Sequence, residues 1–332
     1  MKMSKPKRLS VTQYTEGILA SDRVILSRAI TLVESNLSSD VELAQRLLEN
    51  IIPYSGKAIR IGITGVPGVG KSTFIETFGE YLTQQNKNLA VLTIDPSSQL
   101  TKGSILGDKT RMETLARNPK AFIRPSASGT ALGGVSGKTR EAMLLCEAAG
   151  FDVIFIETVG VGQSETLVHG MVDFFLLLML AGAGDELQGI KKGIMEMADS
   201  VVINKSDGEN VKAAKRAKVE YQNALHLFPA SESGWIPEVK TCSALQNSGL
   251  VEVWEMIEKY VRHTQANGYF EINRKAQNLN WMKENISALI EHEFYSNDAV
   301  KTSLPEITKK VKDGSLPALN AARLLIQKFK DK

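Results

Sequence analysis

The chain has 332 residues, of which 43% are hydrophobic and 23% are charged, as in an ordinary globular protein with a sizeable core. The formal net charge of +3 is nearly balanced, so the charge gives no reason to expect a nucleic acid or a membrane as partner. The two cysteines, Cys146 and Cys242, are too few for a disulfide framework or a zinc site. We therefore expect buried thiols and a reducing, cytoplasmic compartment.

The N-terminus is predicted to be helical. The stretch MKMSKPKRLS is basic but has no apolar segment behind it, so it does not resemble a secretory signal. Apolar residues recur at helical spacing in SDRVILSRAITLVESN, with Ser21 as the expected N-cap, and a second helix is expected from Asp40. Pro53 and Gly56 mark a break. We assign residues 1–56 to an N-terminal helical extension.

From Ile59 onward, short apolar runs alternate with helical stretches. This alternation predicts an α/β fold with a doubly wound, mostly parallel sheet that helices cover on both faces. The run at 171–184 contains Asp173 and is too short to cross a bilayer, so a buried strand explains it better. The predicted strands are IRIGITG (59–65), LAVLTID (89–95), AFIRP (121–125), FDVIFIET (151–158), FFLLLML (174–180), SVVINK (200–205) and EVKTCSA (238–244).

The pattern becomes helical again after Gly249, with a long segment near 270–297 and two short helices joined around Gly314. We therefore expect an α/β core domain over 57–265 and a C-terminal helical segment over 266–332. Amphipathic helices in that last segment are compatible with dimerisation.

The stretch GVPGVGKST predicts a phosphate-binding loop. It fits G-x-x-x-x-G-K-[ST] at every fixed position, between a predicted strand and a predicted helix. Glycines let successive backbone N–H groups point at phosphate oxygens, and the helix N-terminus adds positive potential. Lys71 would reach the β and γ phosphates, and the Ser72 hydroxyl could bind Mg²⁺. The expected nucleotide-binding residues here are Gly65, Val66, Pro67, Gly68, Val69, Gly70, Lys71, Ser72 and Thr73.

A second G-K-T sequence, GGVSGKT at 133–139, fails the same pattern because Leu132 stands where the first glycine is required. No apolar strand runs into it either. We expect a flexible loop that leads into the helix TREAMLLCEAAG.

Guanine is the expected base. Asn204-Lys205-Ser206-Asp207 follows a predicted strand and matches N-K-x-D. A carboxylate at Asp207 can accept the N1–H and N2–H groups of guanine, a pair that adenine does not offer. Asn204 would contact the Hoogsteen side, and the Lys205 stem would cover the ring. Ligands bind at the carboxyl ends of strands in doubly wound folds, and the S-A-x stretch Ser243, Ala244, Leu245 follows another strand.

Mg²⁺ prefers hard oxygen ligands, and carboxylates stand at or near successive strand ends. The expected metal ligands are Ser72, Asp95, Asp108 and Glu157. Glu157 lies in ETVG, where many GTPases have D-x-x-G, so the Gly160 amide could reach the γ phosphate. Either Asp95 or Glu157 could orient the attacking water. Each carboxylate could instead act only as a cap.

Taken together, these stretches resemble the MeaB/ArgK family of GTPases that associate with methylmalonyl-CoA mutase, in the SIMIBI class. The resemblance rests on GVPGVGKST, IDPSSQLTKGSILGDKTRM, GTALGGVSGKTREAMLLCEAAGFDVIFIETVGVGQSE, AGAGDELQGIKKGIMEMAD and NKSD. It runs from about residue 10 to the C-terminus. Ser206 stands where alanine is commoner in the family, at a position that needs no side-chain contact.

The resemblance implies a slow GTPase and homodimer that acts as a chaperone for an adenosylcobalamin-dependent acyl-CoA mutase. Such proteins gate cofactor delivery and protect the mutase. It also implies that Asp95, Asp108 and Glu157 serve as metal and switch carboxylates. The segment 182–193 would be the loop through which the mutase stimulates hydrolysis, with Asp185 and Lys191 as its functional pair. The expected catalytic residues are then Lys71, Asp95, Glu157 and Lys191, and the ligands GTP or GDP with Mg²⁺. The position directly after ETVG is Val161 and not a glutamine, which agrees with slow unaided turnover.

Three alternatives stay open at the level of sequence. An ATPase or kinase linked to basic amino-acid transport is disfavoured by NKSD. A nickel metallochaperone GTPase is disfavoured because His169, His226, His263 and His292 are scattered along the chain. A binding switch without significant hydrolysis is the third.

Overall fold

The computed structural model describes residues 8–35, 37–94, 112–125, 132–158, 164–182 and 192–331. The chain forms two compact units, Met1–Gln277 and Asn278–Lys332, each of which is described by itself below. None of the helices in the described ranges combines the length and the apolar character that a bilayer crossing requires.

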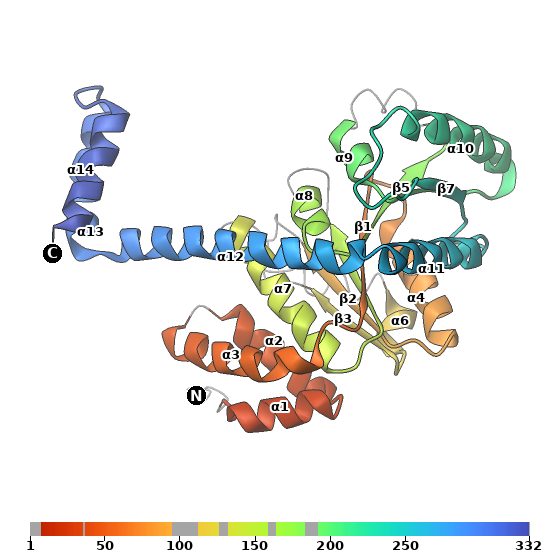
Figure 1. Cartoon of the computed structure of the whole chain (residues 1–332), viewed down its shortest axis with the longest axis horizontal. Coiled ribbons are helices and arrows are strands. Elements are labelled where there is room, and N and C mark those ends of the chain that lie inside the picture. The colour runs from red at the N-terminus through yellow and green to blue at the C-terminus, as the bar shows by residue number, and fades with distance from the viewer. Residues whose placement is uncertain are drawn as a thin grey trace. The chain divides into compact units, whose positions relative to one another are not determined.

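The larger unit carries the sheet and most of the helices (Figure 1). Its strands are β1 Ile59–Gly65, β2 Leu89–Ile94, β3 Ala121–Pro125, β4 Val153–Thr158, β5 Phe174–Leu180, β6 Ser200–Asn204 and β7 Glu238–Thr241. Its helices before β4 are α1 Val11–Leu19, α2 Arg23–Glu34, α3 Ser38–Ile51, η1 Ile52–Tyr54, α4 Lys71–Gln84, α6 Glu113–Arg117 and α7 Leu132–Ala148. Those after β4 are α8 Ser164–His169, α9 Lys192–Met197, η3 Gly208–Asn210, α10 Val211–Leu225, α11 Leu250–Ala266 and the beginning of α12 Tyr269–Ser296.

The seven strands form one parallel sheet in the order β3-β2-β4-β1-β5-β6-β7. β1 lies between β4 and β5, so that Ile61 pairs with Phe155 on one side and Phe174 on the other. β2 and β4 are buried along their whole length, as a sheet covered on both faces requires. The predicted doubly wound α/β fold is confirmed, and so are the bounds of the predicted strands at 121–125 and 174–180.

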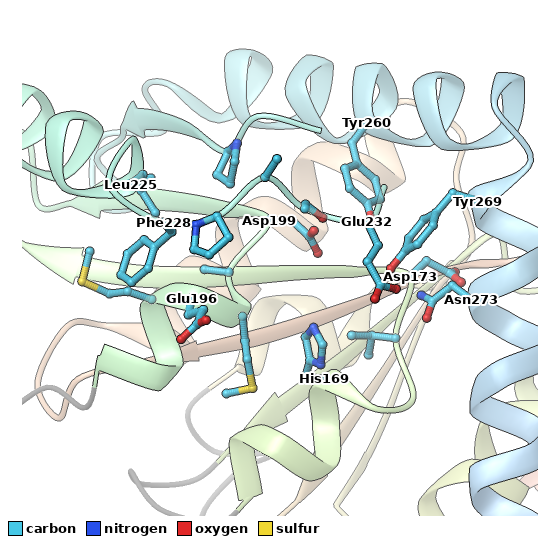
Figure 2. A pocket seen from close by; sticks show the side chains of 18 residues that line it. His169, Asp173, Glu196, Asp199, Leu225, Phe228, Glu232, Tyr260, Tyr269 and Asn273 are labelled. Atoms are coloured by element: carbon cyan, nitrogen blue, oxygen red, sulfur yellow. The ribbon is translucent and has the colours of Figure 1, made fainter. Parts of the chain in front are cut away.

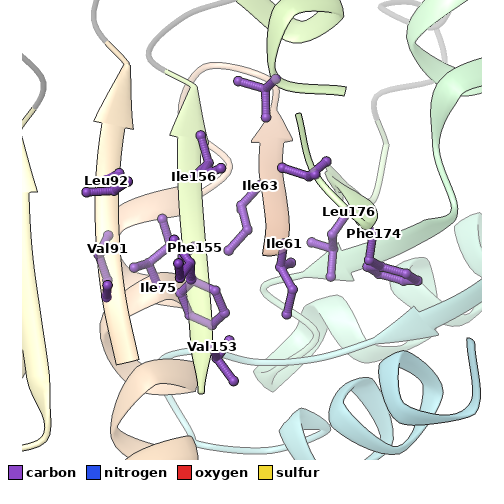
Figure 3. Close-up of a cluster of buried hydrophobic side chains, with 14 of the residues drawn as sticks. Ile61, Ile63, Ile75, Val91, Leu92, Val153, Phe155, Ile156, Phe174 and Leu176 are labelled. Atoms are coloured by element: carbon purple, nitrogen blue, oxygen red, sulfur yellow. The ribbon is translucent and has the colours of Figure 1, made fainter. Parts of the chain in front are cut away.

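Aromatic and branched side chains fill the space between α4 and the sheet (Figure 3). The ring of Phe78 lies 5.3 Å from that of Phe74 and 5.5 Å from that of Phe155 on β4. All three side chains are fully buried, and burial of each contributes roughly 1.5–3 kcal/mol. This packing holds the first turn of α4 against the end of β1, where the phosphate loop lies.

The N-terminal helices pack into the same core, through residues such as Tyr14, Leu47 and Ile51. The predicted N-cap of α2 is wrong by one residue: Asp22 is the cap and accepts from the backbone N–H groups of Val24 and Ile25, at 2.8 and 3.0 Å. The Ser21 hydroxyl instead donates to the Ala149 carbonyl at 2.8 Å. A tertiary contact thus determines the hydrogen-bond partner of the Ser21 hydroxyl.

The expected loop at 133–139 is also wrong, because α7 begins at Leu132 and includes this stretch. Each helical glycine costs about 1 kcal/mol relative to alanine, which is why the sequence favours a loop. Further along, α7 buries Met143, Leu145 and Cys146 in the core. Packing of one helix face supplies most helical stability in proteins and outweighs local propensity here.

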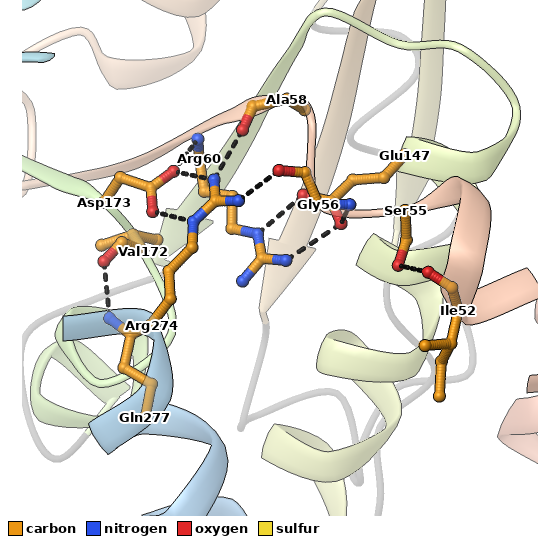
Figure 4. A network of polar contacts seen from close by, with 10 residues as sticks. All are labelled: Ile52, Ser55, Gly56, Ala58, Arg60, Glu147, Val172, Asp173, Arg274 and Gln277. Atoms are coloured by element: carbon orange, nitrogen blue, oxygen red, sulfur yellow. Dashed lines mark hydrogen bonds and ion pairs between the residues drawn. The ribbon is translucent and has the colours of Figure 1, made fainter. Parts of the chain in front are cut away.

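Two buried arginines hold the amino-terminal edge of the sheet (Figure 4). Arg274 of α12 donates to both carboxylate oxygens of Asp173, at 2.6 and 2.7 Å, and to the carbonyls of Gly56 and Ala58. Arg60 of β1 makes a two-bond ion pair with Glu147 of α7, at 2.8 and 2.9 Å. The network joins α12 and α7 to the sheet. Because each of these buried charges is paired with an opposite charge, none of them is left uncompensated.

The smaller unit contains the rest of α12 together with α13 Asp298–Lys312 and α14 Ala318–Lys330. Val300, Ile307, Ala321 and Leu325 form its small core. The joint between α13 and α14 has Gly314 at φ 77°, as predicted from the sequence. The three-part division at residues 56 and 265 stays a prediction; in the structure, Phe270, Arg274 and Gln277 of α12 belong to the larger unit.

We expect Arg274→Ala to lower the free energy of unfolding of the larger unit by about 3–5 kcal/mol, because it leaves the Asp173 carboxylate buried without its cation. Urea denaturation followed by tryptophan fluorescence measures this loss. Arg262→Ala is the control, since Arg262 makes only an exposed, 3.8 Å pair with Glu258 and should cost at most about 1 kcal/mol. Equal losses in the two variants would contradict the structural role of the buried pair.

Candidate nucleotide site

The phosphate loop connects β1 to α4 at the carboxyl edge of the sheet. Gly65 ends β1, and a Cβ there would lie 2.5 Å from the Leu178 carbonyl oxygen of β5, so only glycine allows this close approach. Gly70 precedes α4 in the left-handed region, at φ 87° and ψ 36°. The Phe74 N–H donates to the Gly70 carbonyl at 2.9 Å. The loop therefore leads directly into a helix N-terminus, an arrangement that favours phosphate oxygens.

Lys71 lies across this loop. Its ammonium donates to the Gly65 carbonyl at 2.8 Å. Burial lowers the pKa of Lys71 below its ordinary value of 10.5, whereas the carboxylates of Glu157 and Glu165 act in the opposite direction. The side chain is thus held at the loop, and the two carboxylates favour its charged form.

Asn204 joins the phosphate loop to the loop after β7. It is fully buried at the end of β6, where its amide donates to the Val69 carbonyl at 2.9 Å and its Oδ1 accepts from the Ala244 N–H at 3.2 Å. Lys205 adds a bond from its ammonium to the Gly68 carbonyl at 2.8 Å. These contacts bring together three segments: the phosphate loop is 135 residues from Asn204 in the sequence, and Ala244 is 40 residues from it.

Asp207 lies in the loop after β6 and contacts the loop after β7. Its Oδ2 accepts a hydrogen bond from the Ser243 hydroxyl, and the Ser243 oxygen accepts from the Gln246 N–H at 3.1 Å. The other carboxylate oxygen accepts no hydrogen bond from the described residues, so the side chain is oriented but not saturated. Leu245 is 80% exposed and lies at the surface of this loop. A carboxylate held in this way can accept paired N–H groups from a guanine edge.

Glu157 is the last residue but one of β4 and is 5% exposed. Its neighbours in the sheet are Ile63 of β1 and Thr93 of β2. One residue further on, the Thr158 hydroxyl donates to the Thr64 hydroxyl at 2.9 Å and ties the ends of β4 and β1 together. Glu157 therefore lies at the edge of the sheet that carries the phosphate loop.

Sequence reasoning missed Glu165 and Thr77. Glu165 is fully buried in the first turn of α8, and its charge favours the ammonium form of Lys71. The Thr77 hydroxyl of α4 donates to the Ala244 carbonyl at 3.1 Å. This is a further bond between α4, which follows the phosphate loop, and the loop after β7. Neither residue belongs to a motif, so no sequence signal identifies it.

The side chains near the phosphate loop suit magnesium. Ser72 is half-buried in the first turn of α4, and Glu157 contributes a carboxylate at the same edge; both offer the hard oxygen atoms that Mg²⁺ prefers. Within the described ranges, no three His, Cys, Asp or Glu side chains form a metal cluster by themselves. Mg²⁺ in nucleotide sites is held by one or two protein oxygens together with phosphates and water, and this donor set fits that role.

Five of the predicted site residues lie outside the described residues: Asp95, Asp108, Gly160, Asp185 and Lys191. The rest lie in the phosphate loop, at the end of β4, or in the loops after β6 and β7. Their roles stay predictions, but their placement at one edge of the sheet is what a nucleotide site requires.

Comparison with known proteins agrees with this geometry. The sequence model of the family described as "Methylmalonyl Co-A mutase-associated GTPase MeaB" matches residues 26–299. The chain belongs to this family. The resemblance stated from the motifs is thereby confirmed, and the protein is a P-loop GTPase of the MeaB family.

Relatives of this MeaB-family GTPase match over nearly its whole length. A protein of Caulobacter vibrioides is 50% identical over 321 residues, which cover 97% of this chain and 98% of that protein. The mouse protein named methylmalonic aciduria type A homolog, mitochondrial, is 44% identical over 338 residues, covering 99% of this chain and 81% of its own. A crystal structure described as LAO/AO transport system kinase is 37% identical, with a TM-score of 0.75 and coverage of 98% and 99%.

We expect Asp207→Asn in this MeaB-family protein to weaken GDP binding roughly 10- to 100-fold, because the guanine N–H groups lose a charged acceptor. A xanthosine nucleotide carries an oxygen at position 2, which the new amide can donate to, so it should bind the variant better than GDP does. Calorimetric titration measures both affinities.

The matched control for that variant is Glu209→Gln, which removes an exposed carboxylate two residues away and should leave GDP affinity unchanged. Unaltered GDP affinity in Asp207→Asn would refute the assignment of the base contact.

Proposed function

We propose that this chain is a GTP-hydrolysing chaperone that binds an adenosylcobalamin-dependent acyl-CoA mutase and gates the loading and protection of its cofactor. The observation that carries this proposal is membership of a family described as associated with methylmalonyl-CoA mutase. The name of the mouse relative, which refers to methylmalonic aciduria, supports the same partner. A cytoplasmic location, in keeping with two buried free cysteines, is part of the proposal.

The residues around the phosphate loop support the chemistry. Phosphoryl transfer requires positioning and charge stabilisation more than covalent catalysis. Lys71 and the loop's backbone N–H groups would stabilise the β and γ phosphate oxygens, and Ser72 would hold Mg²⁺, which supplies further positive charge there. Glu157, or Asp95 beyond the end of β2, would orient the attacking water. Ser243, Ala244 and Leu245 would border the base.

Partner stimulation would act through the segment at 182–193. Its proposed pair, Asp185 and Lys191, rests on the sequence alone. A loop ordered by the mutase could bring Lys191 towards the charge that develops on the phosphate in the transition state. The protein would then turn over slowly by itself.

The alternative function is that of a kinase or ATPase in basic amino-acid transport, which the description of the similar crystal structure, LAO/AO transport system kinase, suggests. Asp207 is the residue that favours guanine over adenine, because a carboxylate there matches the guanine edge. For a nickel chaperone, the described residues offer no cluster of histidine and cysteine side chains.

Single-turnover hydrolysis of GTP, measured with and without the mutase, tests the proposal. We expect the rate constant to rise at least tenfold with the mutase, and Lys191→Ala to remove this rise while leaving the unaided rate nearly unchanged. Lys192→Ala, on the adjacent residue, is the control. Fast unaided turnover, or no response to the mutase, would contradict the proposed function.

A homodimer is also part of the proposal, and α12 supports it. Beyond residue 278, this helix exposes apolar side chains at spacings of three and four: Leu279, Met282, Ile286, Leu289 and Ile290, each 47–66% exposed. Such a stripe is typical of a helix that packs on another helix. We expect Ile286→Asp to shift the protein from dimer to monomer in sedimentation velocity, and Glu291→Gln to leave the dimer intact. A dimer that persists in Ile286→Asp would exclude this face.

A further inference from the structure

A cavity of about 350 Å³ lies at the amino-terminal edge of the sheet, away from the phosphate loop. Asp173 and Asp199 line it, and each directly precedes a strand, β5 and β6. Asn204, at the nucleotide end of β6, is five residues beyond Asp199. At roughly 3.3 Å per residue, the two ends are about 16 Å apart. The cavity is therefore distinct from the nucleotide site, and its volume is within the range of small-molecule sites.

The two sides of the cavity differ in polarity (Figure 2). One side carries the apolar side chains of Leu225 and Phe228, with Glu196 beside Phe228. On the other, Tyr260 and Tyr269 lie beside the carboxylates of Asp173 and Asp199. An amphipathic ligand, with one polar end and a hydrocarbon chain, matches this division.

Negative charge dominates the lining of the cavity as a whole. Four carboxylates line the cavity, from Asp173, Glu196, Asp199 and Glu232, and among the described lining residues none is lysine or arginine. Asp173 is paired with Arg274 at 2.6 Å. No ion pair joins the other three to a cation within the described part of the chain. A ligand that brings a positive charge would therefore be favoured, and an anion disfavoured.

The carboxylate of Asp199 is held in place. Its Oδ2 accepts from the Phe175 N–H at 2.8 Å, and the Tyr260 hydroxyl also hydrogen-bonds to it. Tyr260 is itself fixed between the rings of Phe174 and Trp235, at 5.0 and 5.5 Å. An aromatic ring beside a carboxylate favours an organic cation, through the ring face as well as through charge. The site is thus preorganised before a ligand arrives.

We propose that this cavity binds a small aliphatic amine in its protonated form, with the ammonium group beside Asp199 and the hydrocarbon chain against Leu225 and Phe228. The ammonium donates hydrogen bonds to the carboxylate. The hydrocarbon chain of the ligand moves from water to the apolar side of the cavity. The site does not overlap the nucleotide site, so the amine binds the GDP-loaded protein.

Binding of the amine should also depend on pH. Burial, opposed by the bonds from Phe175 and Tyr260, raises the pKa of Asp199 to about 7. An ammonium ligand favours the ionised carboxylate, so the affinity should rise with pH through this value. From pH 6 to pH 8 the ionised fraction grows from about 0.1 to about 0.9, which corresponds to roughly a tenfold gain.

The other groups that face the cavity have to be considered in the same range. Glu196 of α9, Glu232 of the loop after α10 and the arginine-paired Asp173 are the other carboxylates that line the cavity, and Asp199→Asn retains all three. Burial raises the pKa of Tyr260 and Tyr269, so both phenols stay neutral. Burial lowers the pKa of His169 of α8 below its ordinary value. Any positive charge that it gains at low pH would repel the ligand, but Asp199→Asn retains this histidine. The loss of pH dependence in that variant therefore reports Asp199 alone.

Calorimetric titration of the GDP-saturated full-length protein with n-hexylamine tests the proposal. We expect one site per chain, with no comparable binding of 1-hexanol or hexanoate, which share the chain but not the positive charge. Shortening the amine should lower the affinity by up to about fourfold per CH₂ group. Absence of binding, or equal binding of hexanol, would overturn the proposal.

Variants locate the ligand. Asp199→Asn keeps an acceptor for the Phe175 N–H and should weaken n-hexylamine binding at least tenfold at pH 8, with most of the pH dependence lost. Glu232→Gln, at the exposed rim, should weaken it about threefold and serves as the second variant if Asp199→Asn fails to fold. Glu220→Gln, exposed on α10 outside the cavity, should bind as the unmodified protein does. Unchanged affinity in both cavity variants would overturn the assignment.

Discussion

Parallel pairing of β1 with β4 on one side and β5 on the other is the constraint on which the rest of this protein depends. It brings the carboxyl ends of all the strands to one edge of the sheet, so that the phosphate loop, Glu157 and Asn204 meet there. The pairing is close: at Gly65 even a single methyl group would meet the Leu178 carbonyl. Glycine at this position thus serves the packing of the sheet as well as the conformation of the loop.

The nucleotide site is a set of loops that hold one another. The buried amide of Asn204 bonds to Val69 and Ala244, and Lys205 and Thr77 add bonds between the same segments. A buried amide that lost one of these partners would leave a polar group unsatisfied, at a cost of about 1–3 kcal/mol. The motif N-K-x-D therefore has a structural task in addition to contact with the base, because its first two residues fasten the phosphate loop.

At the opposite, amino-terminal edge of the sheet, two buried carboxylates are neutralised by arginines. There Arg60 and Arg274 neutralise Glu147 and Asp173 in pairs with two hydrogen bonds each, which is the geometry that buried charges require. Asp199, one strand away from Asp173, has hydrogen bonds but no arginine, and burial raises its pKa to about 7. The same edge thus combines a neutralised network that joins α12 to the sheet with a cavity in which negative charge is left for a ligand.

The amino-acid sequence by itself determined the fold class, several strand bounds and the two nucleotide motifs, because these depend on local patterns: apolar runs, a glycine-rich loop and a four-residue stretch after a strand. It did not predict the helical start of α7, since packing overrides glycine's low helix propensity there. Only the tertiary structure decided that Glu165 acts on Lys71, that Asn204 bonds to the phosphate loop, and that Asp199, Tyr260 and Tyr269 share one cavity. These residues are far apart along the chain, and long-range strand pairing and helix packing, which no local pattern encodes, set the distances between them.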